Sequence, residues 1–217
     1  MLFNRSEDLT FGPILPWHPG QADIRALPQF FRADLDMVRR QGGSFLRDVI
    51  DRLPLSQRFR YVSIDSRTHM LMPRMYPCIP GWHCDDFFRG DRPQPGLDTI
   101  MEEAPSLHHS AVFGNTSFTE YVTEPIDLPA PSELDNPDNR PIYGVYHRLI
   151  EERGPAVRAL RCGEVVSFGP LVFHRGTPAD RHGWRHFIRV TESNHWQPVN
   201  ELRTQAQVYL TEHFYEW

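Results

Sequence analysis

A histidine and an aspartate two residues apart form the most suggestive chemical pair in this chain. Among 11 histidines, the sequence contains one His-x-Asp pair, His83-Cys84-Asp85. On an extended segment, residues i and i+2 point to the same side, so one imidazole and one carboxylate can bind the same ion without distorting the chain. The spacing therefore predicts two ligands of a metal site.

A third candidate ligand lies later in the chain. The stretch from Gly163 to Gly176 reads as a turn, a buried strand and a histidine, His174, at a strand end. Two histidines and one carboxylate on one face leave adjacent coordination positions open, an arrangement typical of non-haem Fe(II) oxygenases. The alternative is an exposed turn at residues 83–85 and a hydrogen-bonded histidine at position 174.

Two arginines follow His174 on the next predicted strand. Arg185 lies 11 residues and Arg189 lies 15 residues after His174, and both fall on the same strand face. All 23 basic residues of the chain are arginine, so a basic side chain that anchors an anion must be arginine, or a protonated histidine. An arginine fork can bind a carboxylate through two parallel hydrogen bonds. We favour Arg185 as the anchor of a dicarboxylate. Arg189 is the alternative anchor, or else the partner of a substrate anion or of a surface carboxylate.

Neighbours of these residues have simpler interpretations. Adjacent residues of a strand point to opposite faces, which predicts that one of His108 and His109 is buried and the other exposed. We expect Cys84 to serve in packing rather than as a ligand.

The elements that position these residues are mostly short strands. Hydrophobic periodicity predicts two helical pieces over 28–53, separated by Gly42-Gly43, and one helix over 142–153. Strands are expected at 60–64, 69–72, 109–113, 118–122, 156–160, 164–168, 171–174, 184–191 and 205–210. Residues 1–20 read as irregular, and long loops span roughly 88–107 and 124–141. This pattern predicts a mainly β fold, a jelly roll or related barrel.

Composition limits the function classes. The 217 residues suit a single domain, 1–217, with an irregular and helical cover over 1–55 and a β core over 56–217. The absence of lysine excludes Schiff-base and phosphate-loop lysines. A formal charge of −5 argues against general nucleic-acid binding, and no apolar run reaches the about 20 residues of a membrane helix. Three cysteines and a charged N-terminus indicate a reducing cytoplasm.

The ordered set His83, Asp85, His174 and Arg185 resembles the Fe(II)- and 2-oxoglutarate-dependent oxygenase superfamily. The stretch Trp82-His83-Cys84-Asp85-Asp86-Phe87 is especially similar to the phytanoyl-CoA hydroxylase-like branch. The spacing from His174 to Arg185 is similar to that branch and to the taurine dioxygenase group. The resemblance covers about residues 60–192 and implies a double-stranded β-helix core, which is a jelly-roll or cupin-like fold.

The resemblance also implies the ligands of the site. His83, Asp85 and His174 would bind Fe(II), and Arg185 would bind the distal carboxylate of 2-oxoglutarate. The implied activity is a dioxygenase that uses O2, converts 2-oxoglutarate into succinate and hydroxylates a small-molecule substrate. It would need no catalytic residue beyond the metal ligands. Asp85 argues against halogenation, because halogenating relatives lack this carboxylate.

Two other functions stay open on the sequence alone. One is a cupin-like metalloenzyme without 2-oxoglutarate, and the other is a non-catalytic jelly-roll module for binding or assembly. The sequence does not indicate the substrate or the oligomeric state.

Overall fold

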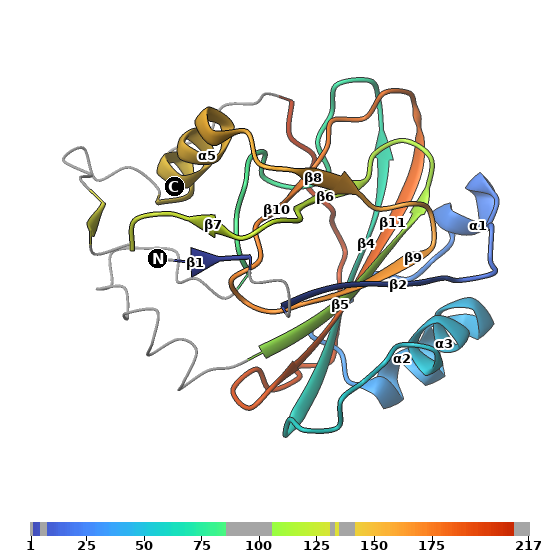
Figure 1. Ribbon diagram of the computed structural model, residues 1–217. Coiled ribbons are helices and arrows are strands. Elements are labelled where there is room, and N and C mark those ends of the chain that lie inside the picture. Colours follow the sequence, from blue (N-terminus) through green and yellow to red (C-terminus); the bar gives the residue numbers. More distant parts are fainter. Residues whose placement is uncertain (1, 5–7, 86–105, 131–132, 135–141, 211–217) are drawn as a thin grey trace.

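The computed structural model describes residues 2–4, 8–85, 106–130, 133–134 and 142–210 of the 217-residue chain. Within these residues the fold is mainly β, and its antiparallel sheets are open rather than closed into a barrel (Figure 1). The expectation of a mainly β fold is therefore confirmed.

The largest sheet has five antiparallel strands. Their order across the sheet is β2 (Leu9–Ile14), β9 (Glu164–Phe168), β5 (Ser106–Gly114), β11 (Gly183–Ser193) and β4 (Tyr61–Leu71). Strands β11 and β4 are paired along their entire lengths, from Gly183 opposite Leu71 to Ser193 opposite Tyr61. This long register fixes which side chains of the two strands share a face.

A second sheet contains β10 (His174–Gly176), β6 (Thr119–Val122) and β8 (Val157–Ala159). A backbone bridge between His83 and His174 adds the segment around His83 to its edge. Two smaller pairs join β1 (Leu2–Phe3) to β7 (Ile126–Asp127) and β3 (Phe30–Phe31) to β12 (Glu201–Leu202).

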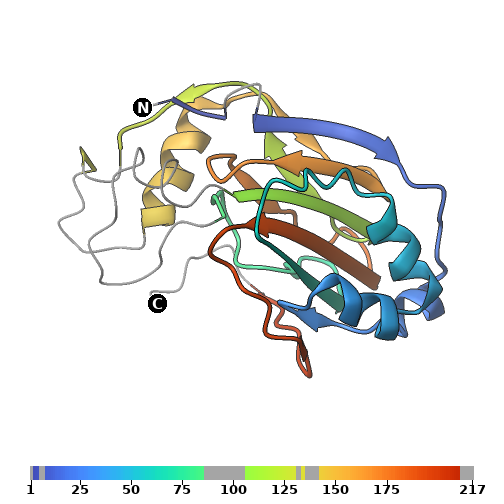
Figure 2. The ribbon, with the colours of Figure 1, turned by 90° about the horizontal axis from the view of Figure 1, so that it is seen from below.

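Helices lie at two places around the strands (Figures 1 and 2). Helices α2 (Leu35–Gln41) and α3 (Gly43–Asp51) lie against one face of the five-stranded sheet, near the short α1 (Gln21–Arg25). Helix α5 (Ile142–Arg153) lies at the other end of the molecule. None of the helices in the described part of the chain is long and apolar enough to cross a membrane.

The two faces of the five-stranded sheet have different partners. On the helix-facing side, alternate strand residues pack with α2 and α3; they include Ile64, Ala111, Phe113, Ile188 and Val190. On the opposite side, here called the inner face, Val112, Val166 and Phe168 pack with Tyr121 of the second sheet and with Val172. Because both faces are covered, many side chains are buried whichever way they point from a strand.

Three sequence expectations about strands are wrong. The strands expected at 60–64 and 69–72 form one continuous strand, β4. Residues 1–20 are not wholly irregular, because β2 joins the edge of the five-stranded sheet, and a register shift between Phe11 and Ile14 accommodates Gly12-Pro13. The segment 205–210 does not form the expected strand, and only a bridge from Tyr209 to Tyr76 is formed there.

Candidate metal centre

The three predicted ligands meet between the two sheets. The candidate ligand atoms of His83, Asp85 and His174 all lie within 4.8 Å of one another. Nε2 of His174 lies 3.5 Å from Oδ2 of Asp85, and His174 is buried while His83 is partly buried. Two imidazoles and one carboxylate are thus brought together from separate segments of the chain.

Both histidines are oriented by the same local contact. Nδ1 of His83 lies 3.1 Å from the carbonyl oxygen of Gly81, and Nδ1 of His174 lies 3.0 Å from that of Val172. A carbonyl oxygen only accepts, so each Nδ1 must carry the proton and donate it, which leaves the lone pair on Nε2. Reciprocal backbone hydrogen bonds of 3.0 and 2.9 Å between His83 and His174 hold the two rings side by side.

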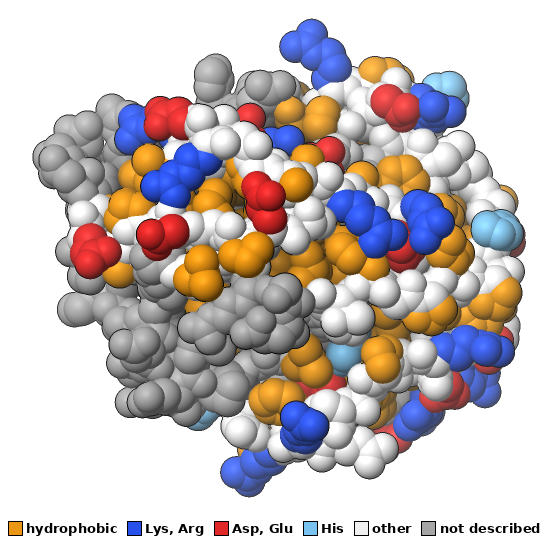
Figure 3. Space-filling view, in the orientation of Figure 1, with side chains coloured by type: hydrophobic (Ala, Val, Ile, Leu, Met, Phe, Trp, Pro, Cys, Tyr) orange, Lys and Arg blue, Asp and Glu red, His pale blue; other side chains and the backbone are white. Residues whose placement is uncertain are grey.

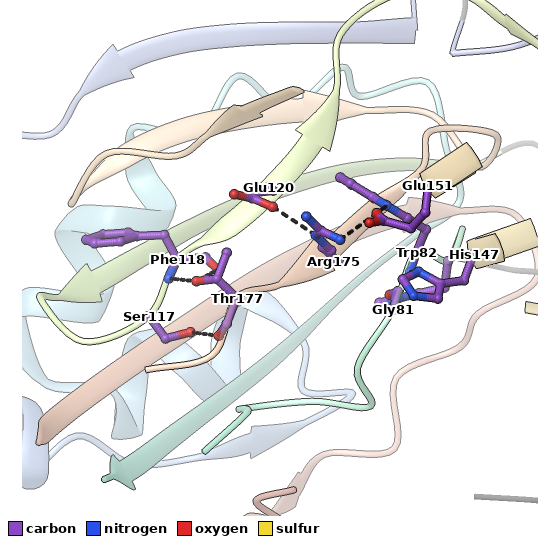
Figure 4. A network of polar contacts seen from close by, with 10 residues as sticks. Gly81, Trp82, Ser117, Phe118, Glu120, His147, Glu151, Arg175 and Thr177 are labelled. Carbon is purple, nitrogen blue, oxygen red and sulfur yellow. Dashed lines mark hydrogen bonds and ion pairs between the residues drawn. The ribbon is translucent and has the colours of Figure 1, made fainter. Parts of the chain in front are cut away.

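Trp82 and Arg175, which lie next to the two histidines in the chain, are held in place by a network of polar contacts (Figure 4). The guanidinium of Arg175 lies 4.2 Å from the centre of the Trp82 ring and donates to Glu120 and Glu151, each at 2.8 Å. The indole of Trp82 donates to the same Glu151 at 2.7 Å. Glu151 on α5 therefore ties the strand positions beside both histidines to one another.

Asp85 forms an ion pair with Arg189. Nη1 of Arg189 lies 2.5 Å from Oδ2 of Asp85, and its Nη2 lies 3.9 Å from Asp65. Burial by itself would raise the pKa of Asp85, but Arg189 and the neighbouring histidines outweigh burial and hold this pKa well below its usual range. Arg189 thus keeps Asp85 in the carboxylate form that a metal requires.

Arg185 has a different environment from Arg189. Its side chain is buried, and its Nε donates to the carbonyl oxygen of Ser117 at 3.0 Å. No carboxylate of a described residue pairs with this guanidinium, and burial lowers the pKa of Arg185 to about 10. Gly114 faces Arg185 across the strand pair at a φ of +124°, where a Cβ would lie 2.7 Å from the Trp184 carbonyl oxygen. Of the two predicted anchors, Arg185 is therefore the one whose guanidinium has no carboxylate partner among the described residues.

Two inner-face residues of β4 escaped the sequence analysis. Arg67 and His69 alternate with Asp65 along the strand, and His69 lies directly opposite Arg185. Burial, Arg185 and Arg67 lower the pKa of His69 to about 3, so this imidazole is neutral. All five residues from 65 to 69 are polar, so the segment reads as a break between two strands rather than as part of a single strand.

The remaining sequence expectations have mixed outcomes. His108 and His109 are both buried, so the expectation of one exposed ring is wrong, because both faces of the sheet are covered. Cys84 is buried in an apolar cluster with Trp82, which confirms its role in packing. Asp86, residues 88–105 of the first long loop and residues 131–132 and 135–141 of the second lie outside the described part of the chain.

The surface does not present an obvious macromolecular site on the side shown in Figure 3. Basic and acidic side chains are interspersed over the described part of that side.

Neither family models nor the curated proteins and solved structures that were searched include a match to this chain. Functional inference therefore rests on the geometry of the inner face.

Proposed function

We propose that the protein is a non-haem Fe(II)- and 2-oxoglutarate-dependent dioxygenase that hydroxylates a small-molecule substrate. The observation that carries this proposal is the pairing of a His-Asp-His cluster with an arginine that no described carboxylate neutralises. A structural ion-pair network would have brought an acidic partner to Arg185, because an uncompensated buried charge is costly.

The donor set fits Fe(II). His83 and His174 would supply Nε2, and Asp85 would supply a carboxylate oxygen, which is a ligand set that leaves positions for a cosubstrate and O2. When bound, the metal and 2-oxoglutarate would supply O2 activation, with succinate and CO2 as products. The protein would orient both rings through their Nδ1 contacts and hold Asp85 ionised through Arg189.

Arg185 is suited to the distal carboxylate of 2-oxoglutarate. Its Nε is already fixed by Ser117, so the guanidinium loses little freedom when an anion binds. Ser117 in turn donates to the carbonyl oxygen of Thr177, two residues beyond Arg175 (Figure 4). The anchor of the cosubstrate and the strand of His174 would therefore be held by one connected set of contacts.

The strand order supports a jelly-roll core of the double-stranded β-helix kind. A five-stranded sheet faces a shorter sheet, all pairings are antiparallel, and the metal ligands lie between the two. The three ligands would come from the edge of the shorter sheet, where His83 bridges His174.

An anaerobic titration with Fe(II) and 2-oxoglutarate tests the proposal. We expect a visible charge-transfer band that saturates at one equivalent of each. Iron binding without such a band would refute the cosubstrate assignment and would favour a metalloenzyme that does not use 2-oxoglutarate. Absence of stoichiometric iron binding would favour a non-catalytic binding module.

Asp85→Ala and Asp51→Ala provide a matched pair of variants for a second assay, which measures succinate formed from 2-oxoglutarate in the presence of Fe(II) and O2. Asp85 would be a metal ligand, whereas Asp51 is an exposed aspartate at the end of α3 that pairs with Arg39. Succinate formation should be lost in Asp85→Ala and retained in Asp51→Ala. Iron-dependent succinate formation by Asp85→Ala at the wild-type rate would exclude Asp85 as a ligand.

A further inference from the structure

The inner face carries more arginines than carboxylates. Four arginine guanidinium groups influence one another there: Arg67, Arg185, Arg189 and Arg203. Two carboxylates of described residues, Asp65 and Asp85, lie among these arginines. Both carboxylates are already engaged, because Asp85 pairs with Arg189 and Asp65 accepts from Arg203 at 2.7 Å.

Arg67 is the arginine of this group for which neither the metal centre nor the cosubstrate site provides a role. Its side chain is partly exposed, and no hydrogen bond or ion pair joins it to a described residue. Burial, followed by the charges of Arg203 and Arg189, lowers the pKa of Arg67, and the single opposing carboxylate is Asp65. The guanidinium therefore lies among like charges, an arrangement that an incoming anion would relieve.

The register places Arg67 within the site rather than beside it. Arg67 on β4 lies opposite Phe187 on β11, and Phe187 is flanked on the same face by Arg185 and Arg189. Arg189 contacts the proposed metal ligand Asp85, and Arg185 is the proposed cosubstrate anchor. A molecule bound to Arg67 would thus lie next to both.

Binding of Fe(II) and 2-oxoglutarate would not neutralise the excess positive charge of the inner face. The two positive charges of Fe(II) and the two negative charges of 2-oxoglutarate cancel, so loading the site as proposed leaves the arginine excess unchanged. His69 does not add to this excess, because its pKa of about 3 keeps it neutral. A second anion is needed to bring the loaded site towards neutrality.

We infer that Arg67 is a substrate-binding residue and that the substrate carries an anionic group, a carboxylate, phosphate or sulfonate, which the Arg67 guanidinium binds. This inference rests on the proposed function for its second ligand, 2-oxoglutarate, but the anion site itself depends only on Arg67 and the arginines around it. A guanidinium binds each of these groups through paired hydrogen bonds.

Calorimetric titration with sulfate, and separately with acetate, tests the inference on protein loaded with Mn(II) and 2-oxoglutarate under anaerobic conditions. With 2-oxoglutarate in place, Arg185 is occupied, so added anion reports on Arg67. We expect one sulfate per chain, weakened at least tenfold in Arg67→Gln and less than threefold in Arg67→Lys. The affinity for 2-oxoglutarate should change far less than the affinity for sulfate in Arg67→Gln. A preference for sulfate over acetate would indicate a phosphate or sulfonate, and the reverse preference would indicate a carboxylate.

Arg47→Gln is the control, because Arg47 is exposed on α3 away from the inner face. It should bind sulfate as the wild type does. Equal sulfate affinity in Arg67→Gln and the wild type, or no sulfate bound by the loaded wild type, would overturn the inference. The same titration without metal and cosubstrate separates the two proposals: Arg67-dependent sulfate binding in protein that does not bind Mn(II) or 2-oxoglutarate would refute the dioxygenase but retain the anion site.

Discussion

The five-stranded sheet carries one buried polar cluster on each face, and the two clusters differ in how their charges are satisfied. On the helix-facing side, Glu192 accepts from the backbone N–H of Ser56 at 2.8 Å, from its hydroxyl at 2.9 Å and from Nε2 of His109 at 2.9 Å. The other ring nitrogen of His109 contacts the Ser167 hydroxyl at 2.8 Å. On the inner face, Arg185 and Arg67 have no described carboxylate partner.

The comparison separates a cluster whose buried groups are all partnered from one that we propose binds ligands. Fully partnered buried groups rigidify a protein, whereas buried charges without partners cost stability and persist at functional sites. The Ser167, His109 and Glu192 cluster resembles a catalytic arrangement in residue type, but its contacts join the segment after α3 to the sheet. We therefore assign it to stability and the inner face to function.

The largest expected effect comes from the partnered cluster. Glu192→Ala would leave the donors of buried His109 and partly buried Ser56 without an acceptor, so the free energy of unfolding should fall by about 3 kcal/mol. Urea denaturation measures this change, with exposed Glu201→Ala on β12 as a control that shifts stability by less than about 0.5 kcal/mol. A loss below about 1 kcal/mol for Glu192→Ala would contradict the assignment.

The pH dependence of stability tests one histidine on each face. Burial lowers the pKa of His69 on the inner face and of His186 on the helix-facing side to about 3 each. Both stay neutral in the folded protein, whereas the unfolded chain takes up protons near pH 6.5. Stability is therefore fully present above pH 6.5 and is lost progressively down to about pH 3, with about 2 kcal/mol lost between pH 7 and 5.5.

Urea denaturation of the metal-free protein at several pH values measures this slope. His69→Asn and His186→Asn should each reduce the loss by about 1 kcal/mol, which is the contribution of one ring. A stability that stays constant from pH 7 to pH 5 would show that these rings are protonated in the folded state.

Arg185→Met should change the free energy of unfolding in the opposite direction from Glu192→Ala. Replacing a buried, uncompensated guanidinium by an apolar side chain of similar length should raise the free energy of unfolding of the ligand-free protein by about 1–2 kcal/mol. Thermal and urea denaturation measure the gain, with Arg47→Met as the surface control. Destabilisation by more than about 1 kcal/mol would mean that the hydrogen bond from Arg185 to Ser117 outweighs the cost of burying the charge.

The smallest expected change in stability comes from Ser167, at the edge of the partnered cluster. Ser167→Ala removes one hydrogen bond to His109 at a half-buried position, so we expect a loss of about 1 kcal/mol and unchanged binding of metal. Reduced Mn(II) affinity in this variant would show that the two faces are not independent.

Local spacing was sufficient to predict most of the His83, Asp85 and His174 cluster that could hold a metal ion. His83 and Asp85 are two residues apart on an extended segment, so short-range geometry determines how these two side chains point. His174 begins β10 and does not end the strand that was expected at 171–174, and its bridge to His83 brings it to the cluster. The strand phase of Arg185 and Arg189 was predictable in the same way. Their different roles were not, because the pairing of Arg189 with Asp85 depends on contacts between distant segments.

The residues that escaped prediction lie where hydrophobic alternation fails. The segment from Asp65 to His69 places polar side chains on both faces of β4, so its strand period is not visible in the sequence. The same covering of both faces explains why His108 and His109 are both buried. Strand β2 was missed because Gly12-Pro13 reads as a loop, whereas the structure accommodates it as an irregularity at a sheet edge.

The most direct test of the central claim compares 2-oxoglutarate with 2-oxobutyrate, which lacks the distal carboxylate, in Mn(II)-loaded protein. If Arg185 binds that carboxylate, the wild type should bind 2-oxoglutarate at least about 30-fold more tightly than 2-oxobutyrate, and Arg185→Met should reduce this ratio to nearly one. Calorimetry gives both affinities in each protein, and Arg47→Met should keep the wild-type ratio. An unchanged ratio in Arg185→Met would contradict the assignment of the inner face as a 2-oxoglutarate site.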